Sequence, residues 1–335
     1  MALPAILEGK LRIPLIGAPM FIVSGPELVI AQCKAGIVGS FPALNARPES
    51  MLHEWLERIT GELAEYAASH PDTPVAPFAV NQIVHRSNDR LRHDVDACVR
   101  YKVPIIITSL RPPAEVVEAV HAYGGVVFHD VINLRHAEKA IRQGVDGIIA
   151  VCAGAGGHAG TTSPFALTKE IRQIFDGTLI LAGAMSRGCD LLAARALGAD
   201  LAYFGTRFIA STEANAPQSY KDMIVQSSAA DIVYTPVFTG VHGSYLRGSI
   251  ENAGIDADRL SETDARSMNF GSGGNSRAKA WRDIWGAGQG VGSIDDIPPV
   301  NDLIMRLERE YKDALQLLSL DRLPACSAPP TLGTA

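Results

Sequence analysis

Short apolar runs rich in β-branched residues recur eight times in the first two thirds of the chain, with segments of helical periodicity between them. Such alternation implies parallel strands joined by right-handed crossovers. Eight β/α units can close into a barrel, so we predict an α/β fold, a (β/α)₈ TIM barrel. An open doubly wound sheet is the alternative. The predicted strands are 14–19, 36–41, 75–81, 103–109, 125–131, 147–153, 178–185 and 201–208, and four of the predicted helices are 112–123, 133–143, 164–175 and 188–197.

The regular alternation ends at about residue 228. A glycine-rich, serine-rich and charged stretch follows, which suits an insertion packed as a lid over the barrel mouth. We therefore expect four parts. Residues 1–228 form the barrel, 229–295 the insertion that shapes the substrate pocket, 296–322 a C-terminal helix on the barrel, centred on 299–318, and 323–335 a disordered tail.

Composition limits the class of partner and compartment. Lys and Arg total 30 against 36 Asp and Glu, a net charge of −6, and no long basic block is present, so nucleic acid is excluded as a partner. No apolar run approaches the roughly 20 residues that span a bilayer, and the N-terminus lacks signal-peptide features. We expect a cytoplasmic protein without membrane contact. The five cysteines are scattered, so neither a disulfide framework nor a metal site is indicated.

The residues that end the predicted strands are small or polar. In a barrel these positions share one mouth, where ligands bind, and small residues let a flat ligand approach the backbone. They are residues 17–20, 40–41, 81–82, 108–109, 129–130, 154–160, 182–185 and 205–206.

Two of these loops have the character of a phosphate site. Gly183 follows the seventh strand and Gly205 the eighth, where barrels recurrently bind phosphate through backbone N–H groups. Thr206 can add a hydroxyl donor or cap the next helix, and Arg207 is either a ligand or a surface ion-pair partner. The alternative is that both glycines only permit tight turns. Gly154, Gly156 and Gly160 miss the dinucleotide-binding spacing by one residue, so we reject a Rossmann site.

The order of these motifs resembles the nitronate monooxygenases, formerly called 2-nitropropane dioxygenases. The matching stretches are PLIGAPM ending at Met20, FAVN at Asn81, AGGHAG at Gly160, AGAM at Met185, ALGAD at Asp200 with FGTRF at Phe208, and WGAGQG at residues 285–290. The resemblance covers residues 10–225 and 280–320. Many relatives have lysine where this chain has His129, an acidic residue at Gly154, and Ser-Gly-Gly at residues 182–184.

The resemblance implies a non-covalent FMN across the barrel mouth. The loop after the first strand would lie against the isoalloxazine, the residues matching Asn81 and His129 would reach its polar edge, and the loops at Gly183 and Gly205 would hold the phosphate. A cation or donor at that edge stabilises the reduced ring. The full set of expected cofactor contacts is Ala18, Pro19, Met20, Asn81, His129, Ala155, Gly156, Gly157, Ala182, Gly183, Ala184, Phe204, Gly205 and Thr206.

The resemblance also implies a catalytic role for His158. Its imidazole would take the α-proton of a neutral nitroalkane and stabilise the anionic nitronate, and a pKa near neutrality suits such a base. Flavin contact without proton transfer and a purely structural role are the alternatives. We interpret Cys152 as a core thiol, with a nucleophile as the alternative. Four residues are expected to line the substrate pocket: His242, Tyr245, Trp285 and Gln289.

The implied function is an FMN-dependent oxidoreductase that oxidises alkyl nitronates with O₂ to a carbonyl compound and nitrite. One alternative is an NAD(P)H-dependent quinone or enoyl-thioester reductase, with NAD(P)H as the reductant. Another is a flavin-containing hydratase or isomerase that acts on a thioester without net redox change. The substrate is a small molecule in each case. The oligomeric state stays open, with a homodimer among the expectations.

Overall fold

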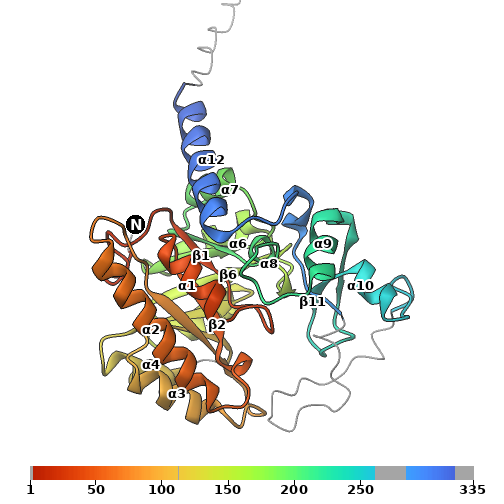
Figure 1. Cartoon of the computed structure of the whole chain (residues 1–335). Coiled ribbons are helices and arrows are strands. Elements are labelled where there is room, and N and C mark those ends of the chain that lie inside the picture. The colour runs from red at the N-terminus through yellow and green to blue at the C-terminus, as the bar shows by residue number, and fades with distance from the viewer. Residues whose placement is uncertain (1–2, 112, 261–283, 321–335) are drawn as a thin grey trace, which may run out of the picture.

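A computed structural model describes residues 3–111, 113–260 and 284–320 and contains an eight-stranded parallel sheet (Figure 1). The strand order is β1-β9-β8-β6-β5-β4-β3-β2. Its two end strands meet, because Ile16 forms a parallel bridge with Val38 and the Gly17 N–H donates to the Val38 carbonyl at 2.8 Å. The predicted (β/α)₈ barrel is therefore confirmed. The barrel strands are β1 (Leu15–Gly17), β2 (Gly39–Pro42), β3 (Phe78–Val84), β4 (Ile105–Leu110), β5 (Val126–Val131), β6 (Gly147–Val151), β8 (Thr178–Ala182) and β9 (Leu201–Phe204).

Helices cover the outside of the barrel, and α12 extends beyond it at the top of the view in Figure 1. The sequence predicted a last helix at residues 299–318, and α12 (Val300–Leu320) lies there. It packs against α7 and α1. The α-helices are α1 (Pro26–Lys34), α2 (Met51–Ser69), α3 (Leu91–Arg100), α4 (Ala114–His121), α5 (Leu134–Ile141), α6 (Pro164–Arg172), α7 (Gly188–Ala196), α8 (Thr206–Ile209), α9 (Gln218–Gln226), α10 (Arg247–Asn252) and α12 (Val300–Leu320). Short 3₁₀ helices are η1 (Ala43–Asn45), η2 (Ala229–Asp231) and η4 (Gln289–Ser293).

The apolar core forms two layers because successive strand residues point to opposite faces. On β4, Ile105 and Ile107 belong to the cluster inside the barrel, whereas Ile106 belongs to the cluster between strands and helices. On β5, Phe128 lies inside, and Val127 and Val131 lie outside. This alternation determines which strand-end residues can reach the mouth.

A second, antiparallel sheet joins the insertion to the barrel. It contains β10 (Ile232–Thr235), β11 (Gly243–Leu246) and the two-residue β7 (Gly157–His158), with His158 opposite Gly243. The pattern of the sequence did not predict β7, because two residues carry no periodicity and their partner strand lies far along the chain. The insertion is therefore attached at the loop that follows β6.

The insertion has a small apolar core of its own. Phe238, Tyr245, Ile250, Ala257 and Ile284 are its buried members. In contrast, Ala287, Val291 and Ile294 belong to the main core. These three residues lie within the expected insertion 229–295, so the chain packs on the barrel again before α12 begins. The expected tail, 323–335, lies outside the described residues.

Within the described part of the chain, no helix is both long enough and apolar enough to cross a membrane.

Candidate active site

The glycine loop between β6 and β7 packs directly against a late segment of the chain, residues 285–290, which we call the strap. A Cβ on Gly156 would lie 2.8 Å from the Gly288 nitrogen, and one on Gly288 would lie 2.6 Å from the Gly154 oxygen. The Gln289 N–H donates to that Gly154 oxygen at 2.8 Å. These glycines therefore let two backbones approach each other. The sequence indicated only contact with the ligand at the barrel mouth for the small residues of this loop.

The loop after β8 adopts a conformation that suits glycine. Gly183 has φ +142°, and a Cβ there would lie 2.9 Å from the Ala153 oxygen. Ala184 has φ +52°, and its N–H donates to the Gly154 oxygen at 3.2 Å. The structure therefore fixes this loop against the glycine loop.

The loop after β9 does not require glycine for its backbone conformation. Gly205 has φ −107°, which other residues also adopt, and a Cβ there would make ordinary contacts with Ala18 at 3.6 Å and Met20 at 3.8 Å. At this position glycine therefore leaves open the space that a side chain would fill, and the backbone conformation does not require it. The Thr206 hydroxyl accepts the Gly288 N–H at 2.9 Å, so its own proton remains available for a ligand.

The loop after β1 reaches the same region. The Ala18 N–H donates to the Phe204 carbonyl at 2.8 Å, which brings the ends of β1 and β9 together. Asn45 holds the loop, because its amide donates to the carbonyls of Met20 at 3.0 Å and Ser24 at 2.8 Å. The Phe204 side chain belongs to the outer core cluster, so the structure brings this residue to the mouth through its backbone alone.

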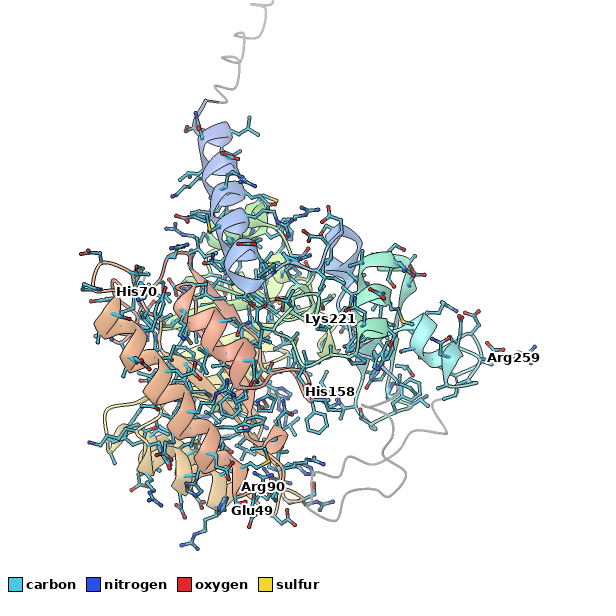
Figure 2. All side chains as sticks on the ribbon, viewed as in Figure 1. Glu49, His70, Arg90, His158, Lys221 and Arg259 are labelled. Atoms are coloured by element: carbon cyan, nitrogen blue, oxygen red, sulfur yellow. The ribbon has the colours of Figure 1, made fainter. Side chains whose placement is uncertain are left out.

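His158 lies between the barrel and the insertion (Figure 2). Burial lowers the pKa of the ring to about 4, so the imidazole is neutral at pH 7. The sequence predicted a His158 pKa near neutrality, which would suit a base. The difference arises because neither the glycine loop nor the strap supplies a carboxylate that could stabilise the imidazolium.

Thr239 sets the tautomer of His158. The His158 Nε2 atom lies 2.9 Å from Thr239 Oγ1, and that hydroxyl donates its only proton to the Val241 carbonyl at 3.0 Å. The proton between the two side chains therefore belongs to Nε2, which leaves the lone pair on Nδ1. Burial raises the pKa of Tyr245, and the neighbouring Thr239 hydroxyl offsets part of the rise. Sequence reasoning missed Thr239, which no motif marked.

Three polar side chains form a chain of hydrogen bonds inside the barrel mouth. The Asn81 amide donates to Ser109 Oγ at 2.9 Å, and the Ser109 hydroxyl donates to Asp130 Oδ2 at 2.6 Å. Asn81 thus lies inside the barrel mouth, as its place at a strand end predicted. Burial raises the pKa of Asp130 to about 6.

The structure does not bring His129 into the mouth. His129 follows the inward-facing Phe128, and its Nδ1 atom lies 2.8 Å from the hydroxyl of Thr108, which also points away from the interior. Burial lowers its pKa to about 4, and the charge of His136 on α5 contributes, so it is not a cation. Because strand residues alternate, Asp130 is the residue at this strand end that faces the mouth. The assignment of His129 to the flavin edge is corrected on this ground.

The four expected pocket residues separate into two groups. Tyr245 and Gln289 lie next to the glycine loop. A Cβ on Gly243 of β11 would lie 3.0 Å from both the Gly157 oxygen and the Tyr245 hydroxyl, and one on Gly154 would lie 3.0 Å from Gln289 Oε1. The ring of Trp285 stacks on Tyr220 of α9 at 4.7 Å, so its side chain supports the strap. His242 is exposed and stacks on Tyr234 at 5.0 Å.

Cys152 is buried at the end of β6, and burial raises its pKa to about 12. The thiol is therefore protonated at neutral pH, which favours a core thiol over a nucleophile. Within the described ranges, no three His, Cys, Asp or Glu side chains gather in a way that could hold a metal ion.

Comparison with known proteins assigns the chain to a family. Residues 41–310 match the family model of nitronate monooxygenase. The chain belongs to the nitronate monooxygenase family. It is 26% identical to a nitronate monooxygenase of Neurospora crassa, with 90% of each chain covered. Among solved structures, FabK from Thermotoga maritima is similar at 25% identity and a TM-score of 0.73, with 94% of this chain and 96% of FabK covered.

The barrel also superposes on a nitroalkane oxidase from Streptomyces ansochromogenes. The TM-score is 0.77 at 21% identity, and the match covers 94% of this chain and 100% of that chain. This likeness shows the fold. Family membership makes the chain an oxidoreductase of a flavin-dependent family.

Proposed function

We propose that this chain binds FMN across the barrel mouth and oxidises alkyl nitronates with O₂ to a carbonyl compound and nitrite. The observation that carries this proposal is a neutral, oriented His158 on a loop that bonds the loop after β8 and packs against the strap, which in turn bonds Thr206 after β9. Family membership agrees with it, and the Neurospora crassa relative is a nitronate monooxygenase by name.

The residues at the mouth fit a flavin. The loops at Gly183 and Gly205, with the Thr206 hydroxyl, would hold the phosphate, and the loop of Ala18, Pro19 and Met20 would cover one face of the ring. Buried polar atoms without protein partners, Asp130 Oδ1 and the Tyr203 hydroxyl, lie inside the barrel where the polar edge of the ring would reach. The proposed cofactor contacts also include, from the set that the resemblance implies, Ala155, Gly156, Gly157, Ala182, Ala184 and the Phe204 backbone.

His158 would hold and move the proton of a neutral substrate. Its neutral ring can accept an α-proton at Nδ1, and the anion that then forms would raise the pKa of the imidazolium and stabilise the charge pair. Thr239 holds Nε2–H throughout. When bound, the flavin would supply the redox chemistry that the oxidation of a nitronate by oxygen requires.

We further propose that the unit with β10, β11 and α10 shapes the substrate pocket. Tyr245 and Gln289 already lie next to the glycine loop, and Thr239 from the same unit bonds His158.

The decisive test is anaerobic mixing of the flavin-loaded protein with one electron donor at a time. We expect a primary alkyl nitronate to bleach the flavin absorbance, and NADH or NADPH to leave it oxidised. Bleaching by a nicotinamide and not by the nitronate would establish the quinone or enoyl-thioester reductase in place of the proposal. Turnover of an enoyl thioester with the flavin oxidised throughout would establish the hydratase or isomerase. The released chromophore, identified by chromatography, should be FMN and not FAD.

A further inference from the structure

Asp130 and Tyr203 place two unsatisfied polar groups inside the barrel mouth. Tyr203 lies on β9 two residues after the inward-facing Leu201 and packs against the cluster inside the barrel, and Asp130 lies on β5 two residues after the inward-facing Phe128. The Asp130 Oδ1 atom and the Tyr203 hydroxyl are both shielded from solvent and have no hydrogen-bond partner in the described structure. Burial raises the pKa of Tyr203, and the Asp130 charge contributes to the rise, so the two groups sense each other across the interior.

A structural role does not explain this arrangement. The other carboxyl oxygen, Oδ2, accepts from Ser109, which in turn accepts from Asn81, so one side of the carboxyl group is held in a fixed direction. A buried carboxylate oxygen without a donor is costly. Leucine could fill the position without this cost, and asparagine would avoid the cost of a buried charge. The arrangement is therefore that of an acceptor and a donor kept for a ligand.

We infer that Asp130 and Tyr203 recognise the imide edge of the bound flavin, with the Asp130 carboxylate accepting the ring N3–H and the Tyr203 hydroxyl donating to an adjacent ring carbonyl. This inference rests on the proposed FMN site. An imide presents a donor between two acceptors, and the two residues offer the complementary groups. Neither residue belongs to the contacts that the sequence motifs indicated.

The charge of Asp130 has a redox consequence. A carboxylate next to the ring edge opposes the negative charge that the ring gains on reduction, whereas a cation there would favour it. The flavin in this chain should therefore have a lower reduction potential than in a variant without that charge. This is the reverse of the tuning that a cation at position 129 would have given.

The experiment compares FMN with 3-methyl-FMN, which lacks the N3–H, and measures affinity for the flavin-free protein at about pH 8, where Asp130 is ionised. Charge-assisted hydrogen bonds contribute about 1.5–3 kcal/mol, so we expect the wild type to bind 3-methyl-FMN roughly 10–100-fold more weakly than FMN. Asp130→Ala should lose most of this discrimination, because the acceptor is gone and the methyl group gains space.

Asp130→Asn, nearly identical in shape, should raise the midpoint potential of the bound FMN. Asp176→Asn is the matched control, since it removes an exposed carboxylate from the loop that precedes β8, and should change neither quantity. Equal affinity of the wild type for the two flavins, or an unchanged potential in Asp130→Asn, would overturn the inference. Failure of the wild type to bind FMN at all would instead contradict the proposed function.

Discussion

His158 Nε2 lies 2.9 Å from Thr239 Oγ1, and this contact joins the glycine loop of the barrel to the insertion. The Thr239 hydroxyl is itself fixed by the Val241 carbonyl at 3.0 Å. The orientation of the candidate base therefore depends on a residue 81 positions further along the chain.

Thr239→Val should keep the shape of the side chain and remove the acceptor for Nε2–H. A neutral hydrogen bond contributes about 0.5–1.5 kcal/mol, so we expect kcat/KM for a neutral nitroalkane to fall roughly 2- to 10-fold. The pH profile should shift as well, because the preferred tautomer is no longer fixed. Thr239→Ser retains the hydroxyl and should restore most of the rate. If the valine and serine variants behave alike, Thr239 only fills space.

The pH dependence of the reaction follows from the lowered pKa of His158. A base acts in its unprotonated form, and kcat/KM reports the pKa of the free enzyme. With a pKa of about 4, the ring stays neutral well below pH 6.5. We expect kcat/KM for a neutral nitroalkane to be flat from neutral pH down to about pH 5 and to fall below that. A titration with its midpoint near 6.5 would show that the ring is solvated in the working enzyme.

The buried carboxyl of Asp130 should destabilise the flavin-free protein at neutral and alkaline pH. Its pKa is raised from 3.8 to about 6, so the ionised form is disfavoured by folding above the folded-state pKa, and the cost vanishes below the unfolded value. Asp130→Asn should therefore raise the free energy of unfolding at about pH 8, by up to about 3 kcal/mol, and by little near pH 4. Urea unfolding at the two pH values measures this. A loss of stability at both would mean that the carboxylate has a stabilising partner.

Gly205→Val should separate flavin binding from folding. The backbone there has φ −107°, which valine tolerates, and its Cβ would lie in ordinary contact with Ala18 and Met20. The branched side chain would then fill the proposed phosphate position, so we expect a folded protein with little FMN. Gly61→Val in α2, where nothing lies within 4 Å of the added Cβ, is the control. Equal flavin content in Gly205→Val and wild type would place the phosphate in another loop.

The barrel could be predicted from the sequence because each strand is a compact apolar run between turn residues. The region of the mouth could also be predicted, because the carboxyl ends of the parallel strands lie at the same end of the barrel. To predict which single residues point into the mouth, the inward or outward direction of each strand residue must also be known. His129 and Asp130 are adjacent, and a one-residue difference decides which one points inward; the inward pattern of Val126 and Phe128 could have identified Asp130.

Other parts of the site depend on contacts between distant segments. The pairing of β7 with β11, the packing of the strap on Gly154 and Gly156, and the bond between Thr239 and His158 all join residues far apart in sequence. Periodicity reports the burial of one segment and carries no information on such partners. The low pKa of His158 likewise results from burial by several segments together, which the small neighbours of the histidine did not indicate.

His158→Asn provides the most direct test of the central claim that this ring is the base of a flavin enzyme. The rate of anaerobic flavin bleaching should be measured for a neutral nitroalkane and for the same compound added as its pre-formed nitronate. General-base catalysis contributes roughly 10²–10⁴-fold, so we expect a loss of this size for the neutral form and a much smaller loss for the nitronate, with FMN content unchanged. An equal loss for both forms, or no loss for either, would contradict the assignment of His158 as the base.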